Sequence, residues 1–144
     1  MRRYSVVAFP GRFGPLASGD GAAVNTDFSV EEHNQGGASV LAATGELDLR
    51  TSPELEDRLT QAFDRGAELV ILDLRGIEFM DSTGLRVLLS AHQRAHESGR
   101  RFALVRGADQ VERVLTLTGV RDLLTVVDAP EELLAAGDQP AESA

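Results

Sequence analysis

A short apolar run from Leu69 to Leu74 constrains the fold of this chain more than any other segment. Five of its six residues are hydrophobic, and only Asp73 interrupts it. Such a run is typical of a strand that is buried on both faces of a sheet. From Leu85 to Ala95, apolar residues then recur at helical spacing, which predicts an amphipathic helix that packs on that sheet. The segment Asp81-Ser82-Thr83-Gly84 therefore lies where a loop after a strand turns into a helix.

The rest of the chain repeats this alternation of strands and helices. Glycines at 36 and 37 predict a hairpin turn, since they tolerate the positive φ angles that such turns need. Thr51 and Glu54 have capping-box spacing, and Pro53 suits a first helical turn. Asp109 is expected to cap a later helix. The predicted strands are 28–32, 39–43, 69–74, 102–105 and 124–127, the helices 51–65, 82–98, 109–118 and 128–136, and a loop is expected at 45–48.

These elements predict an α/β fold with a mixed sheet, an antiparallel N-terminal hairpin and about four α-helices packed against it. The chain has 144 residues, of which 42% are hydrophobic, and this suits one core. Residues 1–25 are rich in Gly, Ala and Pro without periodicity, so we expect a flexible N-terminal tail. The domain is expected at 26–136, followed by a flexible C-terminal tail at 137–144.

Composition excludes several kinds of partner and site. The formal net charge is −9, which disfavours nucleic acid and anionic membrane surfaces as partners. The chain has no cysteine, so disulfides, thiol catalysis and thiolate metal sites are excluded. No apolar run is long enough to span a bilayer. We therefore expect a soluble, cytoplasmic protein with neither a nucleic acid nor a membrane as its partner.

Ser82 has a structural and a functional interpretation. As a structural residue it would cap the helix, a position that serine fills well. As a functional residue it could carry a phosphate, since a helix start offers unpaired N–H groups and a partial positive charge. A phosphoserine beside Asp81 would make the surface strongly anionic and repel a docked partner. Thr83 is the alternative site of modification, and Gly84 leaves room for a partner or a kinase.

Other candidate chemistries are weaker. Asp81, Ser82 and His92 are the residue types of a hydrolase triad, but they lie in one loop–helix unit without a Gly-x-Ser-x-Gly elbow. Glu46 and Asp48 could form an acid–base pair, but they also fit a solvated loop beside the candidate phosphorylation site at Ser82. The three histidines lack metal-ligand spacing, and no phosphate-binding loop or Rossmann fingerprint occurs. We therefore expect no catalytic residue, metal or cofactor; a small hydrolase or a nucleotide-binding protein is the distant alternative.

Three segments resemble the bacterial anti-sigma factor antagonists, which carry the STAS domain. They are Gly45-Glu46-Leu47-Asp48, the stretch from Ile77 to Leu85, and Leu117-Thr118-Gly119-Val120. The similarity extends from about Phe28 to Leu134. The Asp-Ser-Thr-Gly-Leu stretch after Phe-Met is the most specific part, whereas Gly-Glu-Leu-Asp alone would be weak.

The resemblance implies a phosphorylation switch at Ser82, with Thr83 as the alternative. The implied partner is an anti-sigma factor that is a serine kinase, and a serine phosphatase would reverse the modification. The unphosphorylated protein would bind the anti-sigma factor and release the sigma factor, acting as a substrate and not as an enzyme. A STAS module in a signalling scaffold or a lipid-transport complex, without this switch, is the alternative. The residues expected to bind the partner are Glu46, Asp48, Asp81, Ser82, Thr83 and Gly84.

Overall fold

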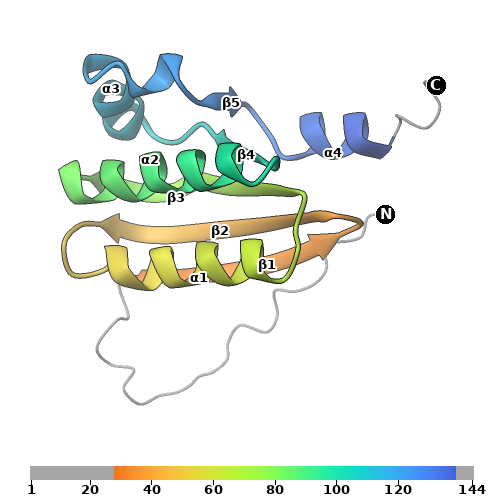
Figure 1. The fold of residues 1–144 in the computed structure, drawn as a ribbon. Coiled ribbons are helices and arrows are strands. Elements are labelled where there is room, and N and C mark those ends of the chain that lie inside the picture. Colours follow the sequence, from red (N-terminus) through yellow and green to blue (C-terminus); the bar gives the residue numbers. More distant parts are fainter. Residues whose placement is uncertain (1–27, 139–144) are drawn as a thin grey trace.

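The protein is a mixed five-stranded sheet with helices on both faces, as seen in a computed structural model that describes residues 28–138 (Figure 1). The strand order is β1-β2-β3-β4-β5; β1 and β2 form an antiparallel hairpin, and the remaining neighbours are parallel. The predicted fold class is therefore confirmed. Residues 1–27 and 139–144, which hold nearly all of both predicted tails, lie outside the described part. The strands are β1 (Phe28–Gln35), β2 (Ala38–Leu47), β3 (Leu69–Met80), β4 (Arg101–Val105) and β5 (Thr125–Val127).

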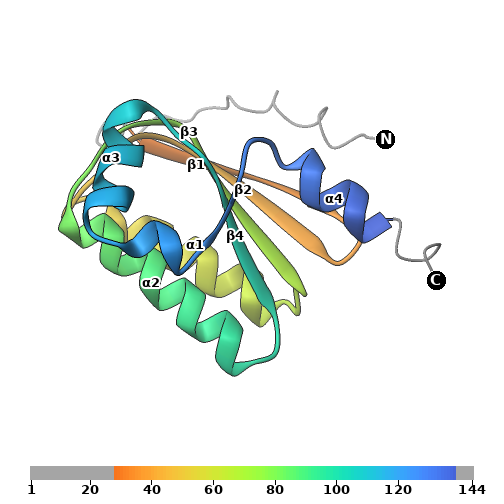
Figure 2. The ribbon, with the colours of Figure 1, turned by 90° about the horizontal axis from the view of Figure 1, so that it is seen from above.

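Four α-helices cover the sheet in two unequal layers. Figure 2 shows α1, α2 and α3 on one face and α4 on the other. Parallel strands need crossovers, and here α1, α2 and α3 are those crossovers. The helices are α1 (Ser52–Asp64), α2 (Ser82–Glu97), α3 (Asp109–Leu117) and α4 (Glu131–Asp138), with a short 3₁₀ turn, η3, at Val120–Asp122.

The central strand β3 contributes to both cores. Leu72 lies in the larger core, beneath α1, α2 and α3, together with Leu88 of α2. Ile71 faces the opposite way and lies in the smaller core with Leu134 of α4. A strand covered on both faces needs apolar side chains at consecutive positions, and this explains the continuous run in the sequence.

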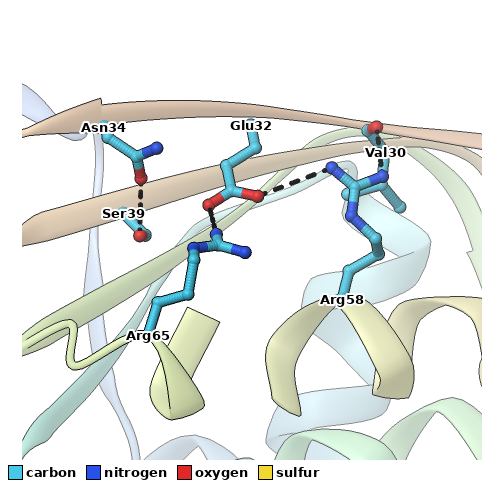
Figure 3. A network of polar contacts seen from close by, with 6 residues as sticks. All are labelled: Val30, Glu32, Asn34, Ser39, Arg58 and Arg65. Carbon is cyan, nitrogen blue, oxygen red and sulfur yellow. Dashed lines mark hydrogen bonds and ion pairs between the residues drawn. The ribbon is translucent and has the colours of Figure 1, made fainter. Parts of the chain in front are cut away.

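An ion-pair network fixes α1 over the hairpin (Figure 3). The Glu32 carboxylate of β1 pairs with the guanidinium groups of Arg58 and Arg65, both on the α1 side, and the Arg58 distance is 3.6 Å. Arg58 also donates a hydrogen bond to the Val30 carbonyl across 3.1 Å. The Glu32 side chain is only 13% exposed, so this network is partly shielded from solvent. It connects the middle and the C-terminal end of α1 to β1.

Strands β1 to β4 are all longer than predicted, and the extensions of β2 and β3 bear on the site. β2 continues to Leu47, so most of the expected loop at 45–48 is strand, and β3 continues past Leu74 to Met80. The polar residues after Leu74 end the apolar pattern, but pairing with β2 maintains the strand across register shifts. Gly76 makes this pairing possible, because an added Cβ would lie 2.9 Å from the Thr44 hydroxyl.

Helix ends also differ from the predictions. Thr51 precedes α1 as expected, but its side chain makes no capping hydrogen bond, so the predicted capping box is wrong. The residue before α3 is Ala108, and Asp109 is the first helical residue instead of its cap. α4 runs from 131 to 138, later at both ends than the predicted 128–136. Capping depends on where a hydroxyl or carboxylate points, which residue spacing does not determine.

Candidate functional site

The site is assembled where β2 and β3 end side by side. Leu47 and Met80 are register partners, and the Asp81 backbone N–H donates to the Leu47 carbonyl across 3.2 Å. The two strands are parallel, so the segments that follow them emerge at the same edge of the sheet. The β2–α1 loop and the start of α2 are therefore neighbours, although more than thirty residues separate them in the sequence.

Asp81 caps helix α2. Its Oδ1 atom accepts hydrogen bonds from the backbone N–H groups of Thr83 at 2.9 Å and Gly84 at 3.2 Å. Its backbone is extended, with φ −112° and ψ −170°, as expected at an N-cap. The interpretation of Ser82 as the cap is therefore wrong: Ser82 is the first residue of the helix. A carboxylate already satisfies the N–H groups that the serine would have bound.

The hydroxyl of Ser82 is accessible. Ser82 is exposed, Thr83 is half-buried, and Gly84 is buried. An added Cβ at Gly84 would lie 2.9 Å from side-chain atoms of both Leu47 and Met80. The small size of Gly84 therefore lets α2 approach the strand ends, which differs from the expectation that it leaves room for a partner.

Asp48 organises the loop beside the helix start. Its Oδ1 accepts from the backbone N–H groups of Arg50 at 3.0 Å and Thr51 at 3.2 Å. The Thr51 hydroxyl donates to the Glu46 carbonyl at 2.7 Å and accepts from the Asp48 N–H at 3.0 Å. Asp48 is thus half-buried and occupied within the loop, whereas the Glu46 side chain is exposed.

Two residues that the sequence did not single out, Leu49 and Arg86, complete this surface. Leu49 is 74% exposed, and Phe79, the register partner of Glu46, is 41% exposed. Arg86, one turn after Ser82, is also exposed and makes no ion pair within residues 28–138. The position of Leu49 between Asp48 and Arg50 hinted at exposure, but many buried residues have charged neighbours. A cavity of about 170 Å³ lies between the starts of α1 and α2, lined by Leu49, Ser52, Pro53, Glu56, Thr83, Arg86, Val87 and Ser90.

The geometry gives no support to a hydrolase triad. His92 lies ten residues after Ser82 on the same helix, about 15 Å along its axis. It is half-buried, on the same helix face as Leu85 and Leu88. Among residues 28–138, no three histidine, aspartate or glutamate side chains are grouped so that they could hold a metal ion. None of the helices in that range is long and apolar enough to cross a membrane.

Comparison with known proteins defines the family. The model of the STAS domain family matches residues 29–133, so this chain belongs to the STAS domain family. This confirms the resemblance drawn from the sequence. A Staphylococcus aureus protein named anti-sigma-B factor antagonist is 28% identical over 105 residues, which cover 73% of this chain and 97% of the relative.

Solved structures agree on the fold. An anti-sigma factor antagonist from Mycobacterium paratuberculosis superposes with a TM-score of 0.70 and 24% identity, covering 76% of this chain and 92% of the other. The phosphorylated form of the Bacillus cell fate determinant SpoIIAA gives a TM-score of 0.58 and 21% identity, covering 75% of this chain and 96% of the other. At these identities the similarity concerns the architecture.

Proposed function

We propose that this protein is an anti-sigma factor antagonist controlled by phosphorylation of Ser82. The unphosphorylated form binds an anti-sigma factor that is a serine kinase, and this binding releases a sigma factor. Phosphorylation weakens the complex, and a serine phosphatase restores it. The protein acts in the cytoplasm as a binding partner and kinase substrate, without catalytic activity of its own.

The observation that carries this proposal is that Asp81, and not Ser82, caps helix α2. Asp81 binds the free N–H groups of the helix, so the hydroxyl of Ser82 is exposed and not needed for capping. A phosphate on Ser82 would lie in solvent at a helix start, where the helix dipole favours negative charge. The modification therefore leaves the scaffold intact.

The same phosphate changes the charge of the surface that a partner would contact. Leu49 and the cavity beside Thr83 provide an apolar contact region at the edge of the switch. A phosphoserine adds about two negative charges there, next to the Asp81 carboxylate. A partner that covers this region must then desolvate those charges, which weakens binding. Exposed Glu46 and Leu49 are proposed to contact the partner directly, while Asp48, Asp81 and Gly84 hold the surface in shape.

Arg86 is the nearest cation on the helix surface. Residues four apart on a helix are neighbours, so the Arg86 guanidinium can reach a phosphate on Ser82. Such a pair would hold the phosphate against the helix and neutralise part of its negative charge. It would also remove Arg86 from contact with a partner, so it adds to the loss of affinity.

Incubation with a candidate anti-sigma kinase and ATP tests the proposal. We expect mass spectrometry to locate one phosphate on Ser82, and none on the Ser82→Ala variant. Calorimetry should then show that Ser82→Ala binds the kinase like the original protein, whereas Ser82→Asp binds at least about tenfold more weakly. Thr116→Asp, exposed on α3, is the charge-matched control and should leave affinity unchanged.

A phosphate found on Thr83 and not on Ser82 would contradict the assignment of Ser82 as the phosphorylated residue. Equal affinity of the Ser82→Asp and Ser82→Ala variants would contradict the electrostatic mechanism. Co-purification with a scaffold or transporter subunit, with no phosphorylation, would support the alternative role of a STAS module without a switch.

A further inference from the structure

A second cavity lies far from the switch. It has a volume of about 180 Å³ and is bounded by the C-terminal half of α2, the start of β4 and α4. Figure 1 shows α4 at the end of the sheet opposite the start of α2. His96, which lines this cavity, follows Ser82 by fourteen residues on one helix, which is about 21 Å. The cavity is therefore separate from the proposed phosphorylation site.

The cavity is lined by basic and apolar side chains. His92 and His96 reach it from α2, and Arg100 and Arg101 reach it from the turn before β4 and from its first residue. Phe102 and Leu133 are among the apolar residues that line it, and no carboxylate side chain does. In a chain with a formal net charge of −9, a cavity lined by basic and not by acidic side chains departs from the overall composition.

Backbone carbonyls hold the guanidinium of Arg100 in place. Arg100 is half-buried, and its guanidinium donates to the Phe63 carbonyl and, across 3.4 Å, to the Ala67 carbonyl. Within residues 28–138, neither this group nor Arg101, His92 or His96 forms an ion pair with a carboxylate. Those carbonyls do not line the cavity, so Arg100 contributes its charge, and the exposed Arg101 carries the guanidinium that is placed to bind an anion there.

We propose that this cavity binds a small phosphate monoester with a compact apolar or aromatic group. An arginine guanidinium matches two phosphate oxygens with parallel hydrogen bonds, and the imidazoles supply further donors. Phe102, from the core under α2, and Leu133, from the α4 side, line the cavity and supply apolar contacts for that group, as in most small-molecule sites. The C-terminal end of α2 disfavours an anion, so affinity depends on the four basic side chains.

Titration with phenyl phosphate, followed by NMR of the ¹⁵N-labelled protein, tests this site. We expect saturable shifts confined to residues 92–103 and the start of α4. Arg101→Gln and His96→Gln should each weaken binding by about tenfold, because both side chains are exposed and hold no structural contact. Arg113→Gln, an exposed arginine on α3, is the matched control and should bind like the original protein. Phenol, which lacks the phosphate, should bind far more weakly.

Three results would overturn the proposal. They are an absence of saturable shifts up to about 10 mM phenyl phosphate, an equal loss of affinity in Arg113→Gln, and equal binding of phenol. The titration uses unphosphorylated protein without kinase, and Ser82→Ala should bind phenyl phosphate equally well. Failure here therefore does not bear on the phosphorylation switch, and failure of the switch does not bear on this cavity.

Discussion

The backbone N–H of Asp81 donates to the Leu47 carbonyl across 3.2 Å, which ties the start of α2 to the end of β2. The Asp81 carboxylate at the same time holds the first N–H groups of α2. One residue therefore joins a strand end to a helix start. Under the proposed function, phosphorylation of the adjacent Ser82 would leave this connection in place.

Asp81→Ala should lower the free energy of unfolding by about 1 kcal/mol, because two backbone N–H groups lose their acceptor. Asp81→Asn should keep most of the stability, since its side-chain oxygen also caps. Ser82→Ala should stay within about 0.5 kcal/mol of the original protein, because the exposed hydroxyl caps nothing. Urea denaturation measures all three, and a larger loss in Ser82→Ala than in Asp81→Ala would contradict the assignment of the cap.

Gly84→Ala should destabilise the protein by up to about 2 kcal/mol, the difference between an overpacking cost of about 1–3 kcal/mol and a helix-propensity gain of about 1 kcal/mol. The added methyl group would lie 2.9 Å from the side chains of Leu47 and Met80, both of which are buried. This overpacking should outweigh the roughly 1 kcal/mol by which alanine exceeds glycine in helix propensity. Thermal unfolding can compare it with Ser90→Ala, an exposed position on the same helix. A gain in stability in Gly84→Ala would show that the contact with the strand ends is loose.

Arg86→Gln should raise the second pKa of a phosphate on Ser82, because the neighbouring guanidinium favours the dianion. Protein with phosphoserine incorporated at position 82 allows the measurement by ³¹P NMR titration without any kinase. Arg94→Gln is the control, since Arg94 lies two turns further along α2 and faces Asp64 at 3.8 Å. Identical titration curves for Arg86→Gln and the original protein would mean that Arg86 does not pair with the phosphate.

His33 should make stability depend on pH. Burial lowers the pKa of His33 from 6.5, and the charges of Glu31 and Glu32 oppose this only in part. Below pH 6.5 the unfolded chain therefore binds a proton that the folded protein binds less readily. Stability should fall as pH drops from 6.5 toward the lower pKa of the folded state, and this contribution should be level above 6.5. In His33→Gln, denaturation between about pH 5.5 and 7.5 should show a smaller slope, whereas an unchanged slope would contradict the assignment.

Much of the fold could be predicted because its signals are local. The apolar run from Leu69 to Leu74 is interpretable as a doubly covered strand, and both the hairpin and helix α2 follow from periodicity and glycine positions. The region from 75 to 80 could not be predicted as strand, because its polar residues are tolerated only through pairing with β2. That pairing depends on the close approach of Gly76 to Thr44.

The sequence by itself determined the type and order of the elements and the family, and it placed Asp81-Ser82-Thr83-Gly84 at a helix start. These depend on spacing and residue type within a few turns of chain. Only the tertiary structure decided that Asp81 caps α2, that Gly84 is buried, and that Leu49 is exposed. It also brought His96 and Arg101 to one cavity. Each of these depends on contacts between elements that are distant in the sequence. The ends of parallel strands lie at one edge of the sheet, so residues far apart in the chain become neighbours there.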